Sequence, residues 1–290
     1  MKESHLIKHP LRTSGVYQKI TAEDAGWTHL NMEARLMRKG EVWAGDTGAN
    51  EYAFILLSGN YAVTTNKGSW QTVNGRKDVF NGIAHTLYLP RHTSFTITAE
   101  SELLDIAAGW CLATGDFPAR FKTPEEAAIE IRGGDNATRQ INSLVEPGFE
   151  CSKIIAVEVY TPSGNWSSFP AHKHDVRKLD AKGVVTEACL EEFYFYKLDS
   201  DKGYALQHVY TADGELNELM QLRTNDVALI PKGYHPVVAA HGYNCYYLNF
   251  LAGSDQSLAN TPDPDHAWIF NSWKGIDPRI PLVKAEMNNR

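Results

Sequence analysis

The feature that most constrains this 290-residue chain is a succession of short segments in which apolar and polar residues alternate. Alternation with a period of two places apolar side chains on one face of a β-strand, and Gly, Asn, Asp and Pro separate the segments at short intervals. Many short strands at such spacing are typical of a sandwich or barrel, so we expect an all-β fold. The predicted strands are EYAFILLSGNYAVTT (51–65), HTLYLP (85–90), SFTITAE (94–100), LLDIAAGWCLA (103–113), KIIAVEVYTP (153–162), EEFYFYKLD (191–199), YALQHVYT (204–211), NELMQLR (217–223), DVALIP (226–231), HPVVAA (235–240) and NCYYLNFLAG (244–253).

The two halves of the chain repeat weakly. EYAFILLSG, which begins at Glu51, resembles EEFYFYKLD around Glu192, and HTLYLPRHTSFTITA resembles DVALIPKGYHPVVAA in the same order. Such a repeat indicates two copies of one β-barrel. Between them TPEEAAIEI (123–131) predicts a short helix with Thr123 as N-cap and Pro124 at its first position. The predicted organisation is an N-terminal barrel at 1–122, a linker with the short helix at 123–144, and a C-terminal metal-binding barrel with its tail at 145–290.

Composition and charge exclude several classes of partner. The net charge of −7 disfavours nucleic-acid binding, and it means that an anionic substrate needs its own Arg or Lys in the site. The sequence has neither an apolar run of membrane-spanning length nor a signal-peptide pattern at its start. The four cysteines are scattered and form no CxxC pair, which is typical of reduced thiols. We therefore expect a cytoplasmic protein with no membrane or nucleic-acid partner.

Four polar side chains in the second half form a pattern typical of metal sites. His172 and His174, in SSFPAHKHD, are two residues apart and therefore share one face of a strand. Glu192 directly precedes FYFY and shares its face with the alternate tyrosines, and His235 follows the turn sequence IPKGY. Three imidazoles and one carboxylate suit a divalent first-row metal that keeps open positions for water or substrate.

The repeat between the two halves indicates which glutamate is the ligand and which half binds metal. Strand parity allows only one of Glu191 and Glu192 to point inward, and the repeat favours Glu192 because it aligns with Glu51, with Glu191 as the alternative. The first half has no His-x-His before Glu51, and no His matches His235 after its own turn. We therefore expect metal in the second half alone.

The order of these residues resembles the two-part cupin signature, in which a leading glycine, here Gly164, precedes a His-x-His and a Glu, and a Pro-x-Gly turn precedes a final His. Two features depart from the signature. Seventeen residues separate His174 from Glu192, where the usual cupin has only a few, so DVRKLDAKGVVTEACL must loop out. One residue rather than two separates Gly233 from His235. The first departure bears more on the Glu192 assignment than on the histidines.

Longer motifs narrow the resemblance: RGGDNATRQI, SSFPAHKHD, LEEFYFYKLD, LQHVYT, DVALIPKGYHPVVAAHGYNCYYLNFLAG and HAWIFNSWKGIDPR. Nearly the whole chain is similar to the bacterial 5-deoxy-glucuronate isomerases of myo-inositol breakdown, which are related to the uronate ketol-isomerases. The resemblance implies a bicupin with two tandem β-barrels of the jelly-roll (double-stranded β-helix) type. The implied reaction converts 5-deoxy-D-glucuronate to 5-dehydro-2-deoxy-D-gluconate. The implied cofactor is zinc or manganese, held by His172, His174, Glu192 and His235.

An aldose–ketose isomerase moves a proton between adjacent carbons and, for an acid substrate, needs a cation for the carboxylate. His208, in YALQHVYT, is the expected base or hydrogen-bond partner of the substrate, with an ordinary buried histidine as the alternative. Glu192 is expected to act in catalysis as well as in metal binding. The expected substrate-binding residues are Lys232, inside the Pro-Lys-Gly turn, Arg223, and Tyr246 or its neighbour Tyr247.

Two other functions stay open. Three His and one Glu also suit non-haem iron, so a cupin dioxygenase is an alternative, and oxygen-dependent turnover would identify it. A non-catalytic sugar-acid-binding protein is the other, and it would need no stoichiometric metal. The segment at 175–190 is expected to form a static surface loop or a lid over the substrate. We also expect the protein to form a homo-oligomer.

Overall fold

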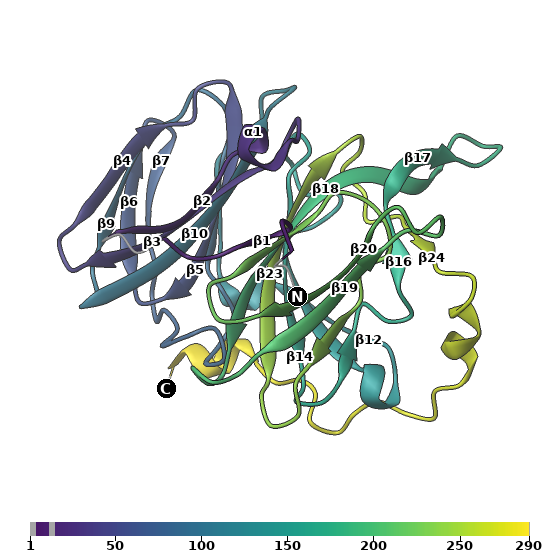
Figure 1. The fold of residues 1–290 in the computed structure, drawn as a ribbon. Helices are drawn as coiled ribbons and strands as arrows, with labels where there is room; N and C mark the ends of the chain where they lie inside the picture. Colours follow the sequence, from purple (N-terminus) through teal and green to yellow (C-terminus); the bar gives the residue numbers. More distant parts are fainter. Residues whose placement is uncertain (1–3, 12–14, 290) are drawn as a thin grey trace. The chain divides into compact units, whose positions relative to one another are not determined.

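The computed structural model describes residues 4–11 and 15–289, and it is built almost entirely of strands (Figure 1). The predicted all-β fold is confirmed. The chain divides into two compact units. The N-terminal unit comprises Pro10–Ala128, Ser143–Ala156 and the residues from Val283 onward, and the C-terminal unit comprises the residues up to His9, Ile129–Asn142 and Val157–Leu282. This division differs from the predicted boundaries because each unit also takes in segments from the other half. No helix among the described residues has the length and apolarity to cross a membrane.

The N-terminal unit contains two antiparallel sheets, with strand orders β11-β8-β5-β10-β3-β2 and β4-β9-β6-β7. Large apolar side chains from both sheets, among them Phe54, Phe95 and Ile106, form one buried cluster. The strands are β2 (Val16–Ile20), β3 (Asn31–Arg38), β4 (Val42–Asp46), β5 (Asn50–Ser58), β6 (Tyr61–Thr65), β7 (Gly68–Gln71), β8 (Thr86–Leu89), β9 (Ser94–Ala99), β10 (Leu103–Leu112) and β11 (Arg120–Lys122). The helical segments are α1 (Ala22–Ala25), η1 (Pro124–Glu126) and η4 (Ala285–Asn289).

The C-terminal unit holds a large sheet of order β1-β21-β18-β23-β14-β13-β12, with β17 also paired to β18, a sheet of order β15-β22-β19-β20, and the pair β16-β24. Its strands are β1 (Ile7–Lys8), β12 (Ala128–Arg132), β13 (Arg139–Val145), β14 (Ile155–Thr161), β15 (Trp166–Ser167), β16 (His172–Lys173), β17 (Asp175–Leu179), β18 (Val185–Leu198), β19 (Ala205–Tyr210), β20 (Asn217–Leu222), β21 (Val227–Ile230), β22 (Val237–Ala239), β23 (Cys245–Gly253) and β24 (Thr261–Pro262). Two 3₁₀ turns, η2 (Asp135–Ala137) and η3 (Ala267–Asn271), complete it.

The predicted repeat appears in the strand order. In the N-terminal unit β5 lies between β8 and β10, and in the C-terminal unit β18 lies between β21 and β23. Glu51 and Glu192 both belong to the central strand of their trio, and both are buried. The strand registers place the two glutamates differently. Tyr52 pairs with Leu89, and Glu192 pairs with Ile230, the residue that matches Leu89 in the repeat. Tyr52 packs against the core cluster, and Glu51, one residue earlier, lies on the opposite face of its strand. The predicted alignment of Glu51 with Glu192 is therefore wrong by one residue.

The helix expected at 123–131 is wrong beyond its first turn. Thr123 occupies the predicted N-cap position, with its backbone N–H donating to Glu126 Oε2 at 2.7 Å, and Pro124 begins η1. The turn ends at Glu126, and the chain continues as strand β12. The β-branched Ile129 and Ile131 favour an extended backbone, and pairing with β13 decides the outcome.

Glu51 is held by the protein itself. Its carboxylate accepts hydrogen bonds from the backbone N–H groups of Ser152, Lys153 and Ile154 at 2.6–2.9 Å, and from the Tyr88 hydroxyl at 2.8 Å. All these residues belong to the N-terminal unit. The Glu51 carboxylate thus closes a turn and has a structural role.

Glu51→Ala is expected to destabilise the N-terminal unit by about 3 kcal/mol, because it leaves several buried donors without an acceptor. Chemical denaturation followed by circular dichroism measures this loss, with the exposed Glu102→Ala as the matched control. An unfolding midpoint equal to that of the control would show that Glu51 does not support this turn.

Candidate metal centre

Three side chains from distant parts of the C-terminal unit converge. His174, Glu192 and His235 are buried, and each offers a ligand atom within 4.8 Å of the others. His174 lies between β16 and β17, Glu192 lies on β18, and His235 lies in the loop between β21 and β22. The cluster therefore joins three segments that are close together only in the folded chain.

Backbone carbonyls set the orientation of both imidazoles. The Nδ1–H of His174 donates to the carbonyl of Leu190 at 3.2 Å, and the Nδ1–H of His235 donates to the carbonyl of Gly233 at 2.8 Å. Each ring therefore presents its Nε2 atom to the cluster. The Nε2 atoms lie 3.0 Å (His174) and 3.4 Å (His235) from Oε2 of Glu192. An imidazole held in one tautomer by a carbonyl is the usual arrangement of a metal-binding histidine.

The donor atoms have the spacing that a small divalent ion requires. Ligands at 2.0–2.2 Å around a tetrahedral ion lie about 3.3 Å from one another, close to both distances from Glu192. Nε2 of His235 is buried and makes no hydrogen bond to any residue that the structure describes. A buried polar atom without such a partner is costly, and a metal ion would satisfy it. The residues present therefore fit a divalent metal.

Burial favours the neutral form of two of the three histidines, His172 and His235. For His174 burial acts in the same direction, but the hydrogen bond to Glu192 and its charge outweigh it and raise the pKa. Burial lowers the pKa of His235 to about 3, with the nearby charge of His174 adding to the effect. Burial, followed by the charges of His235 and His174, holds the pKa of His172 well below its usual range. Burial also raises the pKa of the Glu192 carboxyl. A divalent ion would offset that last penalty because it stabilises the ionised carboxylate.

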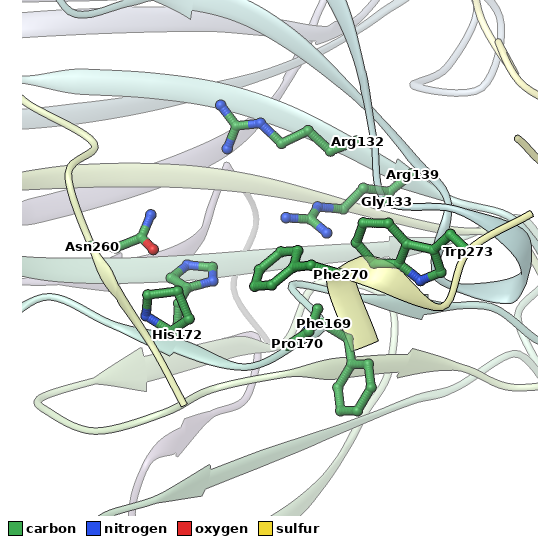
Figure 2. Close-up of a pocket in the computed structure, with 10 residues that line it drawn as sticks. Arg132, Gly133, Arg139, Phe169, Pro170, His172, Asn260, Phe270 and Trp273 are labelled. Carbon is green, nitrogen blue, oxygen red and sulfur yellow. The ribbon is translucent and has the colours of Figure 1, made fainter. Parts of the chain in front are cut away.

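His172 lies beside the three-residue cluster. Its ring centroid is 4.9 Å from that of His235 and 6.3 Å from that of His174. It lies on β16, where it pairs with Pro262 of β24, and it also lines a cavity of about 210 Å³. Figure 2 shows His172 facing this cavity. The structure thus places the fourth predicted ligand between the cluster and an open space.

Glycine is required in the turn that precedes His235. Gly233 has a φ of +86°, and a Cβ at this position would lie 2.4 Å from the carbonyl oxygen of Tyr210. Its backbone N–H donates to Asp175 at 2.9 Å, and its carbonyl accepts from the ring of His235. The turn therefore orients the imidazole and joins it to the chain segment that carries His174.

The long segment between His174 and Glu192 is a hairpin, where we expected a loop or a lid. Its strands β17 and β18 pair from Asp175↔Cys189 to Leu179↔Val185. Glu187 is fully buried there and binds Lys173 at 3.0 Å, Lys178 at 2.5 Å and the Thr261 hydroxyl. Because Lys173 lies between the two histidines in sequence, this ion network holds the ligand strand in place.

A polar interior lies next to the cluster. Tyr194, two residues after Glu192, packs with its ring 5.9 Å from His235 and 4.8 Å from Tyr247. The hydroxyls of Tyr247 and Ser167 are 2.5 Å apart. Burial, with the charge of Glu192 as the next cause, raises the pKa of Tyr194 well above its ordinary value, and burial raises the pKa of Tyr247. Both hydroxyls therefore stay protonated at neutral pH and are donors.

A model described as the KduI/IolB family matches residues 5–269 of the chain. The chain belongs to this family. A relative from Geobacillus thermodenitrificans (strain NG80-2), named 5-deoxy-glucuronate isomerase, is 36% identical over 270 residues, which are 92% of this chain and 96% of the relative. A relative of the same name from Bacillus subtilis (strain 168) is 30% identical over 269 residues, 92% of this chain and 96% of the relative.

Solved structures support the fold. The crystal structure of an IolB-like protein from Salmonella typhimurium LT2 has a TM-score of 0.87 and 32% identity, and the match covers 92% of this chain and 99% of that chain. A mutant of Bacillus subtilis oxalate decarboxylase has a TM-score of 0.61 at 13% identity, with 90% of this chain and 80% of that chain covered. The second likeness concerns the fold alone, and it confirms the predicted bicupin architecture.

Within this family member, some predicted site residues lie away from the cluster. His208 shares its strand with Gln207, which points inward and bonds Tyr196, so the opposite parity places His208 on the other face, where its ring bonds Asn217 at 2.7 Å. Glu191 likewise has the parity opposite to Glu192 and is not part of the cluster.

The predicted substrate-binding residues are also elsewhere. Lys232 is exposed and pairs with Glu215 at 2.8 Å, and Arg223 is exposed. Tyr246 is buried and packs edge-on against Tyr160, because Tyr247 is the member of that pair that faces Tyr194. None of the three lines the cavity beside His172.

Sequence reasoning missed Arg139, which lines that cavity together with His172. Arg139 begins β13, 33 positions before His172 in the sequence. A signal was present, because Arg139 belongs to RGGDNATRQI, one of the motifs that carry the family resemblance. The motif alone does not indicate which of its two arginines is buried.

Proposed function

We propose that this chain is a metal-dependent aldose–ketose isomerase that converts 5-deoxy-D-glucuronate to 5-dehydro-2-deoxy-D-gluconate in inositol breakdown. The observation that carries the proposal is the convergence of His174, Glu192 and His235 in a chain whose near-full-length relatives are named 5-deoxy-glucuronate isomerase. A small sugar acid is the substrate of this reaction. The cavity beside His172, of about 210 Å³, is smaller than the roughly 300–1,000 Å³ pockets that take drug-sized ligands, which suits such a substrate.

His172, His174, Glu192 and His235 would hold the metal, with His172 completing the set from the cavity side. Zinc is the first candidate, and manganese is the second. A bound divalent ion supplies Lewis acidity, which polarises the carbonyl and stabilises the negative charge of an enediolate. Bacillus subtilis oxalate decarboxylase, a distant structural neighbour, is described as having Mn(II) centres, and its likeness to this chain bears on the fold alone.

The residues around the cluster support the proton movements of the reaction. Glu192 supplies negative charge at the centre, with its Oε2 atom 3.0 Å from Nε2 of His174 and 3.4 Å from Nε2 of His235. Tyr194 and Tyr247 keep their protons next to the cluster, so each would donate a hydrogen bond to a substrate oxygen that reaches the metal and would stabilise charge that develops there. The buried aromatic wall formed by these rings excludes water from the reacting carbons.

The function is tested by incubating the purified, metal-loaded protein with 5-deoxy-D-glucuronate in deuterated water and following the products by NMR. We expect the ketone signal to replace the aldehyde at equal rates with and without oxygen. Deuterium in the product at the carbon next to the carbonyl would identify transfer by way of an exchangeable proton. No ketone formation under these conditions would refute the proposal, and a rate that requires oxygen would favour a dioxygenase.

His208→Ala is expected to keep its metal and to turn over within about twofold of the unmodified protein, because surface substitutions away from a site have small effects. Its ring lies on the outer face of β19 and bonds Asn217. Initial rates and metal content measure the effect. A large loss of rate with full metal content would return the role of catalytic base to His208.

We also propose a cytoplasmic location. Cys111, Cys151, Cys189 and Cys245 are all free thiols in the structure, which supports a reducing compartment. To test this, growing cells are separated into cytoplasmic and other fractions, and the protein is detected in each with an antibody. Recovery outside the cytoplasmic fraction would contradict the proposal.

A further inference from the structure

The cavity beside the metal cluster contains a buried cation that no described residue binds by a hydrogen bond or ion pair. Arg139 is only 8% exposed and lines the same cavity as His172. Figure 2 shows its side chain extending into this space, toward His172 and Asn260. The guanidinium makes no hydrogen bond or ion pair with any residue that the structure describes. Burial lowers the pKa of Arg139, which is the expected response of a cation removed from water.

Several other arginines of the chain are paired with carboxylates, and the buried Arg76 donates to the backbone carbonyls of Leu56 and Gly82. Arg91 binds Asp116 and Arg177 binds Asp255, each through two hydrogen bonds at 2.7–3.0 Å. Arg132 lines the cavity as well, but Glu130 binds it at 2.6 and 2.8 Å. Glu130 acts on Arg139 through its charge alone, with no hydrogen bond between them. A buried charge without a partner costs several kcal/mol, and proteins keep such a group where a ligand supplies the opposite charge.

From these observations we infer that Arg139 binds the carboxylate of the sugar-acid substrate, while the cluster of His174, Glu192 and His235 receives the carbonyl end. This inference rests on the proposed function for the identity of the substrate. A guanidinium is the side chain that matches a carboxylate with two parallel hydrogen bonds. One cavity lined by both His172 and Arg139 therefore fixes which end of the acyclic sugar reaches the metal.

The rest of the cavity suits the carbon chain between these ends. Phe270 and Trp273 supply apolar walls, and Asn260 supplies an amide for a hydroxyl group. Glu192 is the acid of the neighbouring cluster, and a metal ion there would neutralise it. The cavity is thus positively charged although the whole chain has a net charge of −7. An anionic substrate is therefore attracted by the cavity itself and not by the overall charge of the protein.

The turn between the two arginines builds the wall of the cavity. Gly134 lies against Trp273, and a Cβ on this glycine would come within 2.5 Å of the Cβ of Trp273. The Asp135 N–H donates to the carbonyl of Gly275 at 2.7 Å, and Asp277 N–H donates to the Thr138 hydroxyl at 3.1 Å. RGGDNATR therefore positions Arg139 and anchors the C-terminal segment that closes the cavity over the substrate chain.

The test compares 5-deoxy-D-glucuronate with 5-deoxy-D-glucose, which carries a primary alcohol in place of the carboxylate. The unmodified protein is expected to prefer the acid in kcat/KM by about a hundredfold, because the alcohol leaves the buried guanidinium without its charged partner. Arg139→Gln should abolish this preference while metal content and unfolding midpoint stay unchanged, and Arg139→Lys should restore part of it. Arg91→Gln, which alters a partly exposed arginine of the N-terminal unit, is the matched control.

A binding measurement separates this inference from the proposed function. Zinc-loaded protein is titrated calorimetrically with D-gluconate and with uncharged D-sorbitol, so no turnover is required. We expect tighter binding of gluconate, and loss of that difference in Arg139→Gln and not in Arg91→Gln. If the unmodified protein shows no isomerase activity but Arg139→Gln loses gluconate binding, the proposed function fails and the carboxylate site stands. If Arg139→Gln keeps the preference for the acid in either assay, the inference is wrong.

Discussion

His174→Ala and His235→Ala are each expected to lose the bound divalent metal and at least about a thousandfold in isomerase rate, because Lewis-acid stabilisation supplies several kcal/mol to the barrier. Each imidazole is held by a carbonyl so that its Nε2 atom faces Glu192. Removal of one ring takes away one of the four proposed ligands and leaves a gap in the buried ligand cage, which should weaken metal binding. Metal content by plasma mass spectrometry and initial rates by NMR measure the two losses together.

The matched control for these variants is His208→Ala, which removes an imidazole from the same unit but from the outer face of β19. The ligand variants should still fold, since the strands and their apolar cores remain, and near-ultraviolet circular dichroism checks this. A His174→Ala protein with a full complement of metal and an unchanged rate would show that the ion is bound elsewhere. If His208→Ala also lost its metal, the loss in the ligand variants could come from disturbed folding of the unit and would not identify the ligands.

Removal of the metal with a chelator is expected to abolish turnover reversibly and to lower the unfolding temperature. A ligand that binds the native state alone stabilises it by about 4 kcal/mol at a thousand times its dissociation constant, and removing it forfeits that amount. Zinc or manganese should restore both rate and stability. Metal binding should weaken in acidic buffer, because protons compete for the imidazoles and for the carboxylate.

Magnesium provides the control for re-addition, because it prefers oxygen ligands and should not replace the ion in a site made largely of imidazoles. The Glu51→Ala variant helps to separate the two units, since its defect lies in the N-terminal unit and should leave the metal-dependent part of the unfolding transition in place. Full activity after exhaustive chelation, with no metal detected, would contradict a metal-dependent mechanism.

Strand periodicity predicted most of the fold because the apolar faces of the strands are long and regular. Glu192, Tyr194 and Tyr196 alternate along β18, so their shared face could be read directly from EEFYFY. Shorter strands such as β16 and β24 have two residues each and carry no periodic signal. The failed helix after Thr123 shows the same limit, since pairing with β13 outweighed the local helix-start signal.

The sequence predicted those site residues whose order along the chain forms a recognisable motif. It did not predict which face of a strand is buried, or which distant residues meet in the folded chain. The three clustered ligands could be named from the order His-x-His, Glu and Pro-x-Gly before His. The face on which His208 lies could not be read from the sequence, because its strand buries the alternate residue, Gln207. Arg139 was missed because nothing local indicates that an arginine at the start of a strand is buried beside a histidine far along the chain.

The most direct test of the central claim is anomalous X-ray scattering from crystals of the zinc-loaded protein, measured on both sides of the zinc absorption edge. The account predicts one strong anomalous peak in the C-terminal unit, at about 2.1 Å from Nε2 of His174 and His235 and from a carboxylate oxygen of Glu192. A peak elsewhere in the chain, or none at these atoms in a fully loaded and active protein, would contradict it.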